Sequence, residues 1–446
     1  MREQIVRGGT LVTPDGLLRA DLRIEGETIQ AIEPEIRGGG RVVDATGLHV
    51  FPATIDVHVH FNEPGRAEWE GSATGSRALA AGGGAVFFDM PLNSTPCTVN
   101  AREFDRKRAA LEASSIADFG IWGGLIPGNL AEMAELADRG AVGFKAFLCD
   151  SGLPEFPRAD DLTLWEGLAE AARLDLPVAV HAESQELTQE LSRRRTAKGI
   201  SPVADFLASR PVLAELEAIQ RATLMAGETK ARLHIVHVSS GRAAAAAAEA
   251  RARGVDVSIE TCPHYLFFTS EDLERLGALA KCAPPPRNRE HQNELWAELV
   301  KGAIDIVASD HSPAPPEMKT GDFEGAWGGV AGVQSTLNVL LDRGHFNRGI
   351  PLEHIAGLLA ATPARRFRIP RRGSIRPGNH ADLTLVDLAG SFTLQPEEMA
   401  HRHRLSPYAG EKFRGVVRRT IRRGETIFAD GSFPSITRGQ LVRPER

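Results

Sequence analysis

Residues 51–370 alternate between short apolar segments and longer stretches with helical periodicity, and this alternation limits the fold more than any other feature of the chain. The apolar segments are rich in β-branched and aromatic residues, which favour buried strands. We expect strands over residues 55–60, 85–89, 119–123, 142–147, 178–181, 233–237, 255–260 and 304–310. Helices are expected between them, including 162–172, 212–225, 243–248 and 292–301. Eight such repeats predict an α/β protein whose catalytic domain, residues 51–370, is a (β/α)8 TIM barrel.

The two ends of the chain have a different pattern, in which short strands are separated by tight turns. Near the start, residues 10–12 precede a Pro-Asp-Gly turn, and near the end residues 382–386, 416–421 and 425–429 are expected to form strands. We therefore predict one small β-sandwich domain built from residues 1–50 and 371–446, with the barrel inserted between its two halves.

The composition excludes several classes of protein. The net charge of −6 gives no basic excess for nucleic acid, and no apolar run is long enough to cross a bilayer, so we expect neither a nucleic-acid nor a membrane partner. One basic run is interpreted as the solvated face of a strand and turn rather than a patch for an anionic partner: Arg418, Arg419, Arg422 and Arg423. The four cysteines are too few and too scattered for a disulfide framework, which predicts reduced thiols in a cytoplasmic protein: Cys97, Cys149, Cys262 and Cys282.

Ionisable side chains stand at or near the ends of five predicted strands. His58 and His60 are two residues apart on the first strand, so both imidazoles project from one face. The other donors are Lys145 on the fourth strand, His181 on the fifth, His237 on the sixth and Asp310 on the eighth. Each alone could be a hydrogen-bonded core residue or part of a turn. Together, at the end of a barrel where active sites lie, they indicate a metal site, because burying several ionisable groups is costly unless they are paired or bind a cation.

Lys145 requires a separate explanation, because an ammonium group repels metal ions. It could form a salt bridge with a carboxylate. Alternatively, carbon dioxide could carboxylate its ε-nitrogen to give an anionic carbamate that bridges two cations, and a buried lysine with a lowered pKa is the form that reacts in this way.

Long motifs in the chain resemble those of the binuclear amidohydrolase superfamily, in its cyclic-amide branch of dihydroorotases, hydantoinases and allantoinases. The motifs that carry the resemblance cover residues 58–66, 69–71, 89–94, 143–148, 150–152, 208–211, 262–266, 309–313 and 326–332. Within this branch they are most similar to the allantoinase group. The resemblance covers nearly the whole chain, including the split β-sandwich.

The resemblance implies two divalent metal ions, about 4 Å apart as in other two-metal hydrolases. His58, His60 and Asp310 would bind one ion, His181 and His237 the other, and carboxylated Lys145 would bridge them. Zinc is the metal we expect first, with cobalt, manganese or iron as alternatives. Asp310 would transfer the proton in a hydrolysis that opens the hydantoin ring of allantoin to give allantoate. A homotetramer is the oligomer that the resemblance suggests.

Further residues are expected to contact this small-molecule substrate. Dihydroorotases carry Arg two residues after the second His, where it binds a substrate carboxylate; this chain has Asn62, which suits a neutral amide, although Asn62 could simply form the turn that ends the strand. The resemblance to hydantoinases suggests that backbone groups near Cys282 and Gly329 hold the ring. Other candidates for the pocket are Asn93, Asp150, Ser151 and Ser312, whereas His264 is assigned no ligand role.

Two other functions remain open from the sequence. Dihydroorotase or hydantoinase activity is the nearest enzymatic alternative, and Asn62 argues against the first of these. A catalytically inactive structural relative, of the dihydropyrimidinase-related kind, is disfavoured because every ligand position is filled.

Overall fold

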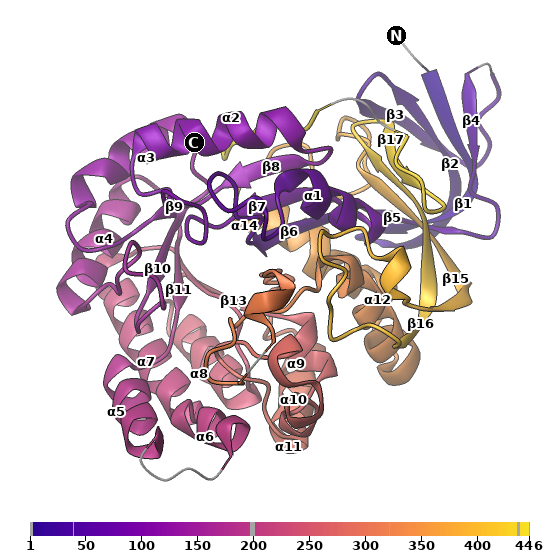
Figure 1. Cartoon of the computed structure of the whole chain (residues 1–446). Coiled ribbons are helices and arrows are strands. Elements are labelled where there is room, and N and C mark those ends of the chain that lie inside the picture. Colours follow the sequence, from indigo (N-terminus) through magenta and orange to yellow (C-terminus); the bar gives the residue numbers. More distant parts are fainter. Residues whose placement is uncertain (1–2, 39, 197–200, 321, 435–437, 446) are drawn as a thin grey trace.

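The computed structural model describes residues 3–38, 40–196, 201–320, 322–434 and 438–445. Its central feature is a closed barrel of parallel strands with helices outside it (Figure 1), which confirms the predicted fold class. The strands are β6 (Thr54–Val59), β7 (Gly84–Asp89), β8 (Asp118–Ile121), β9 (Gly123–Gly124), β10 (Phe144–Phe147), β11 (Val178–His181), β12 (Leu233–Ile235), β13 (Val257–Thr261) and β14 (Ile306–Val307).

Backbone hydrogen bonds close the barrel between its first and last strands. The His60 N–H donates to the His311 carbonyl at 2.8 Å, and Val59 forms a parallel bridge with His311. Closure places the carboxyl ends of all these strands around one opening, which is where barrels of this type build their sites.

Helices cover the outside of the barrel, and the longer ones follow the amphipathic pattern expected from the sequence. The principal helices are α1 (Ser72–Ala81), α2 (Ala101–Ser114), α3 (Met133–Arg139), α4 (Asp161–Arg173), α5 (Gln185–Thr196), α6 (Pro202–Ser209), α7 (Val212–Thr229), α8 (Gly241–Ala252), α10 (Ser270–Leu276) and α11 (Arg289–Val300). Shorter helices are α9 (Pro263–Phe267), α12 (Thr336–Val339), α13 (Leu352–Ala356) and α14 (Thr362–Arg366). Among the described residues, every helix falls short of the length and apolar character that crossing a bilayer requires.

A second sheet combines strands from both ends of the chain (Figure 1). The order is β17-β16-β15-β5-β1-β2-β3, with β4 also paired to β1. The bounds are β1 (Glu3–Thr13), β2 (Gly16–Glu25), β3 (Thr28–Glu33), β4 (Arg41–Asp44), β5 (His49–Pro52), β15 (Leu383–Thr393), β16 (Lys412–Arg422) and β17 (Glu425–Ala429). Antiparallel pairing of β5 with β15 joins the two halves, so the β-rich part is built from both termini as expected. The domain limits at residues 50 and 371 stay a prediction.

Several details differ from the sequence-based expectation. The predicted strand over 304–310 is reduced to β14, that over 233–237 ends at Ile235, and that over 119–123 is divided into β8 and β9. Asp310 and His237 have positive φ angles, so neither can belong to a strand. The basic run of residues 418–423, which we expected to be a solvated face, is only partly exposed to solvent. Arg422 and Arg423 are buried and face Asp118 at the start of β8, with Arg423 Nε 3.0 Å from the carboxylate.

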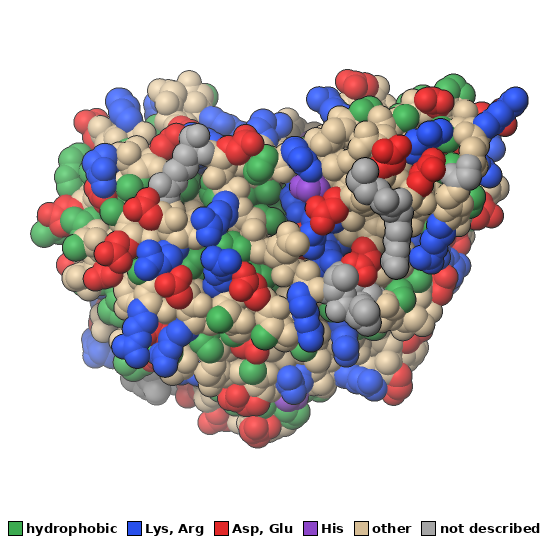
Figure 2. All heavy atoms as spheres, turned by 90° about the horizontal axis from the view of Figure 1, so that it is seen from above, with side chains coloured by type: hydrophobic (Ala, Val, Ile, Leu, Met, Phe, Trp, Pro, Cys, Tyr) green, Lys and Arg blue, Asp and Glu red, His purple; other side chains and the backbone are tan. Residues whose placement is uncertain are grey.

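Acidic and basic side chains are intermixed over the face of the molecule drawn in Figure 2. This arrangement agrees with the small net charge and gives that face no single dominant sign.

Candidate metal centre

All six predicted metal-binding residues line one cavity of about 390 Å³ at the carboxyl ends of the barrel strands. His58 and His181 are in β6 and β11, and Lys145 is in β10; His60, His237 and Asp310 lie just beyond the ends of β6, β12 and β14. The convergence expected from the sequence is therefore present in the structure.

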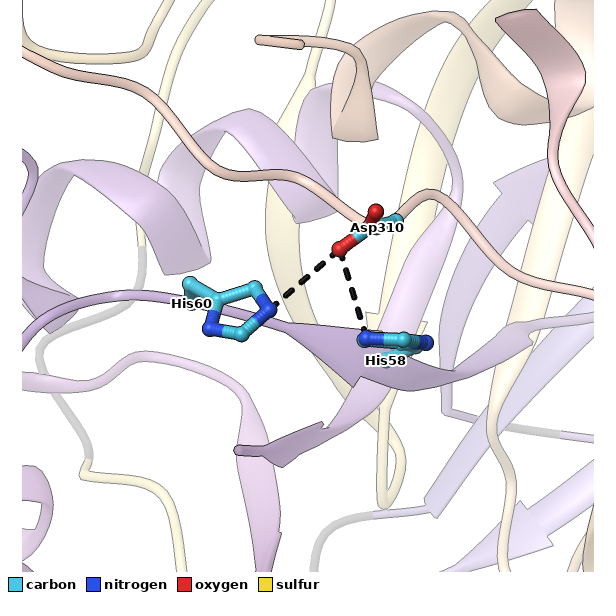
Figure 3. Close-up of side chains that lie close together, drawn as sticks. All are labelled: His58, His60 and Asp310. Carbon is cyan, nitrogen blue, oxygen red and sulfur yellow. Dashed lines mark ion pairs between the residues drawn. The ribbon is translucent and has the colours of Figure 1, made fainter. Parts of the chain in front are cut away.

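Asp310 lies between the two imidazoles of the His-x-His pair (Figure 3). Its Oδ1 atom is 3.3 Å from His58 Nε2 and 3.3 Å from His60 Nε2. Each of the three residues offers one donor atom within 4.8 Å of the others, a grouping that could hold a metal ion. The donor set of imidazole and carboxylate is one that divalent transition metals accept.

His181, His237 and Lys145 complete the other side of this group. The rings of His181 and His237 are 4.6 Å apart, and the ring of His237 is 5.6 Å from that of His58. Lys145 is fully buried, and its Nζ has no hydrogen-bond partner among the described residues. The salt bridge considered for Lys145 is therefore not formed here.

The titration behaviour of these groups favours cation binding. Burial lowers the pKa values of His58, His181 and His237, so their imidazoles are neutral, the form that binds metal ions. Burial also lowers the pKa of Lys145 to about 8. For Asp310 burial acts in the opposite direction, but the neighbouring His58 and His60 outweigh it and hold the pKa of Asp310 well below its usual range.

Four of the predicted site residues have backbone conformations that non-glycine residues adopt rarely. The φ angles are 64° for Asn62, 68° for Asn93, 41° for His237 and 44° for Asp310. Strain of this kind persists where the surrounding structure enforces it, and it is concentrated at functional sites. Here the four strained residues follow the ends of four different strands, β6, β7, β12 and β14.

Two buried glutamates that the sequence analysis did not single out contact the imidazoles. Glu260 Oε1 is 2.8 Å from His58 Nδ1, and Glu183 Oε2 is 2.8 Å from His181 Nε2. Such carboxylates fix which ring nitrogen carries the proton and leave the other to bind a cation. Glu183 also belongs to a second candidate group with Cys149 and His181, but it is ion-paired with Arg210, and burial raises the pKa of the Cys149 thiol to about 12.

Sequence signals for the two glutamates exist, although they are weak. Glu260 ends the predicted strand 255–260, in the same position as the histidines on other strands, and Glu183 follows His181 by two residues. Their role becomes clear only when the contacts across the barrel are known.

The cavity also contains most of the residues proposed to contact substrate. Those that line it are Asn93, Asp150, Ser151, Cys282, Ser312 and Gly329. Asn62 is the exception, because it is buried outside the cavity lining and its carbonyl accepts the Arg66 N–H at 3.0 Å in the turn after β6. Its direct contact with substrate stays a prediction. His264 is buried in α9, and burial lowers its pKa to about 4.

Comparison with known proteins agrees with this geometry. The pattern of the Amidohydrolase family matches residues 49–427. The chain belongs to the amidohydrolase family. Among similar amidohydrolases, a protein of Solibacter usitatus named allantoinase is 61% identical over 100% of this chain and 98% of its own length. An allantoinase of Rubrobacter xylanophilus is 54% identical over 99% of this chain and 98% of its own.

Solved structures place the same fold over the whole length. The L-hydantoinase of Arthrobacter aurescens superposes with a TM-score of 0.96 at 32% identity, covering 99% of this chain and 100% of the other. The chain is an amidohydrolase, and the group of His58, His60 and Asp310 gives it a candidate metal-binding site of the kind expected in such a hydrolase.

Proposed function

We propose that this protein is an allantoinase, a hydrolase that opens the hydantoin ring of allantoin by cleaving a cyclic amide to give allantoate. The observation that carries the proposal is the agreement between full-length relatives of that name and a cavity that contains all six expected donors. An inactive structural relative is disfavoured for the same reason.

The residues fit a pair of divalent cations. His58, His60 and Asp310 would hold one cation, and His181 and His237 would hold the other, with zinc expected first and cobalt, manganese or iron as alternatives. The fit is supported by His58 and His181, whose pKa values are lowered and whose second ring nitrogens contact Glu260 and Glu183. When bound, such cations lower the pKa of water and withdraw electron density from a carbonyl oxygen.

Lys145 would bridge the cations after carboxylation. Its Nζ lone pair forms an N–C bond to carbon dioxide, and one proton leaves to water, which gives an anionic carbamate. Two properties of Lys145 support this step: its pKa of about 8 increases the fraction of neutral amine, and its Nζ has no partner in the described structure that would compete.

Asp310 is the group that would move the proton. Its carboxylate is anionic at neutral pH and partly exposed to the cavity, with 13% of the side chain accessible. It can accept a proton from the attacking water at Oδ and donate it to the ring nitrogen as the amide bond breaks. Its Oδ1 atom lies 3.3 Å from the Nε2 atoms of His58 and His60, so the carboxylate faces both imidazoles.

The charges of the cavity favour a neutral substrate over dihydroorotate, which carries a carboxylate. Among the described lining residues, the cations other than Lys145 are already engaged. Arg210 is paired with buried Glu183, and the Lys281 ammonium donates to three backbone carbonyls. A substrate carboxylate would therefore find no available fork of N–H donors of the kind that binds it best.

A direct test is to assay S-allantoin, dihydroorotate and hydantoin side by side with the metal-loaded protein. We expect allantoate release to exceed turnover of the other two substrates. Faster opening of dihydroorotate or hydantoin would replace the proposal by one of the neighbouring activities.

Assembly and location stay predictions. We expect a homotetramer, which light scattering coupled to gel filtration would measure, and a cytoplasmic protein. The four cysteines, all unpaired and buried in the structure, are compatible with a reducing compartment.

A further inference from the structure

One wall of the cavity is a loop without regular hydrogen-bonded structure, residues 323–329, which we call the 323–329 loop. Five of its residues line the cavity: Gly325, Ala326, Trp327, Gly328 and Gly329. A wall made of irregular backbone needs another source of rigidity, because such segments open more easily than strands or helices.

The Lys281 side chain supplies part of that rigidity. Its Nζ donates to the carbonyls of Phe323 at 2.7 Å, Glu324 at 3.0 Å and Ala326 at 2.7 Å. An ammonium has three N–H donors, so all three are used on one short stretch of backbone. The Lys281 carbonyl in turn accepts the Gly329 N–H at 2.7 Å.

Lys319 has the same arrangement at the other end of the loop. Its Nζ donates to the carbonyls of Trp327 at 2.9 Å and Gly329 at 2.6 Å, and to that of Ala278 at 3.2 Å. Five carbonyls of the loop are thus held by two ammonium groups that approach from different segments.

Neither lysine forms an ion pair with a carboxylate in the described part of the chain, so charge pairing does not explain their burial. Lys281 is 8% exposed, and Lys319 is partly buried. A buried cation is costly unless its donors are satisfied. The carbonyls satisfy them, which ties the conformation of the backbone to the two side chains.

The end of the loop is also fixed against the segment that carries Asp310. Gly329 has φ of 148°, and a Cβ there would lie 2.1 Å from the Ser312 carbonyl oxygen. Movement of this backbone would therefore alter the distance between the loop and the reacting group. Both polar backbone groups of Gly329 are already engaged by the two lysines.

We propose that Lys281 and Lys319 are positioning residues that hold the 323–329 loop as a fixed wall of the substrate cavity and thereby set how tightly substrate binds. The kinetic consequence rests on the proposed allantoinase function. The structural consequence, a loop whose order depends on two ammonium groups, does not.

The test compares Lys281→Met and Lys319→Met with Lys301→Met, a matched control on α11 whose exposed ammonium pairs with Glu298. We expect KM for allantoin to rise about 10- to 100-fold in the first two variants, because a loosened cavity wall weakens binding of ground state and transition state alike, which raises KM and leaves kcat. We expect kcat within about threefold of wild type and an unchanged metal content, because the metal-binding side chains are not touched. Lys281→Gln and Lys319→Gln, which keep two N–H donors, should give intermediate values, and they replace the Met variants if those do not fold.

Hydrogen exchange of the backbone amides in 322–329 provides the second readout. Faster exchange there in the lysine variants, with exchange in the rest of the barrel unchanged, supports the proposed role of the lysines. This holds even if the wild-type protein does not hydrolyse allantoin. Absence of that activity would refute only the proposed allantoinase function. Wild-type KM and wild-type exchange in folded lysine variants would overturn the inference. A loss of bound metal with unchanged exchange would also overturn it, because the lysines would then act on the metal centre.

Discussion

Asp310 combines three properties that rarely occur together in one residue. It has a positive φ angle, it contacts two imidazoles from β6 and the turn after it, and its pKa is held well below the usual range. A carboxylate in this state remains an anion at neutral pH and accepts a proton only when the reaction supplies one. These properties support the proposed role of Asp310 as the proton carrier.

Replacement of Asp310 by Asn should lower turnover about 10²- to 10⁴-fold, the usual contribution of a proton-transfer group. The amide keeps the size of the side chain but cannot accept and return a proton. Steady-state allantoin hydrolysis measures the effect, with Asp15→Asn in the exposed hairpin turn as the control. Near-normal turnover in the Asp310 variant would exclude the proton-transfer role.

Lys145→Ala should abolish binding of the metal pair, because the bridging carbamate is lost and nothing replaces its oxygen atoms. Elemental analysis of the purified variant measures bound metal, and short carboxylic acids added to it should restore part of the activity by supplying a replacement carboxylate. Two tightly held ions in the untreated variant would contradict the bridging role.

At the scale of secondary-structure elements, the position of the His-x-His segment depends on a buried ion pair between β7 and α2. Lys107 Nζ is 2.5 Å from Asp89 Oδ2 and also donates to the Met90 carbonyl at 2.7 Å. The other oxygen of Asp89 accepts the Phe61 N–H at 2.8 Å, directly after His60. The pair therefore links a helix, a strand end and the metal-binding turn.

Lys107→Met should lower the free energy of unfolding by about 3–5 kcal/mol, because removing one partner leaves an uncompensated buried charge. Urea denaturation followed by circular dichroism measures the change. The control Lys301→Met removes an exposed ion pair and should cost less than about 1 kcal/mol. Equal midpoints for the two variants would show that the buried pair does not stabilise this region.

At the scale of the whole molecule, charged groups hold the sheet built from both ends of the chain against the barrel. Asp118 at the start of β8 is fully buried and pairs with Arg372 and Arg423. On the other side, the segment after β15 packs over the barrel through Glu70, which accepts the Arg402 N–H at 3.1 Å, and through His401 beside His311. Stability of the assembled fold should therefore depend on pH.

His401 gives that dependence a definite sign. Burial lowers its pKa to about 4, whereas an unfolded His titrates near 6.5. Between these values the unfolded chain binds more protons than the folded one, so stability falls as pH is lowered. Linkage predicts a loss of about 2 kcal/mol between pH 7 and pH 5 from this group.

Urea midpoints of wild type and His401→Gln at the two pH values measure this contribution. Between pH 7 and pH 5, the free energy of unfolding should fall by about 2 kcal/mol less in the variant than in wild type. An identical acid loss in both proteins would show that His401 does not titrate in this range.

The sequence was sufficient for the fold class and for the convergence of six side chains on one cavity, because both depend on local patterns: short apolar strands, helical periods and side chains at strand ends. It was not sufficient for the residues that contact these side chains or the loop beside them and hold them in place. Glu260 meets His58 from a position 202 residues away, and Lys281 meets the carbonyl of Glu324 from 43 away. Such contacts follow from barrel closure and loop conformation, which leave no local signature. The positive φ angles of His237 and Asp310, which exclude both residues from β12 and β14, also have no signal in the local sequence.

We propose that the six side chains at the strand ends hold the metal ions that allantoin hydrolysis requires. The most direct measurement is allantoate release by the purified protein before chelation, after removal of metal, and after addition of zinc, cobalt or manganese with bicarbonate. We expect activity to disappear with the metal and to return as two equivalents are bound per chain. Full activity in metal-free protein, or none in protein carrying two ions, would contradict the proposal.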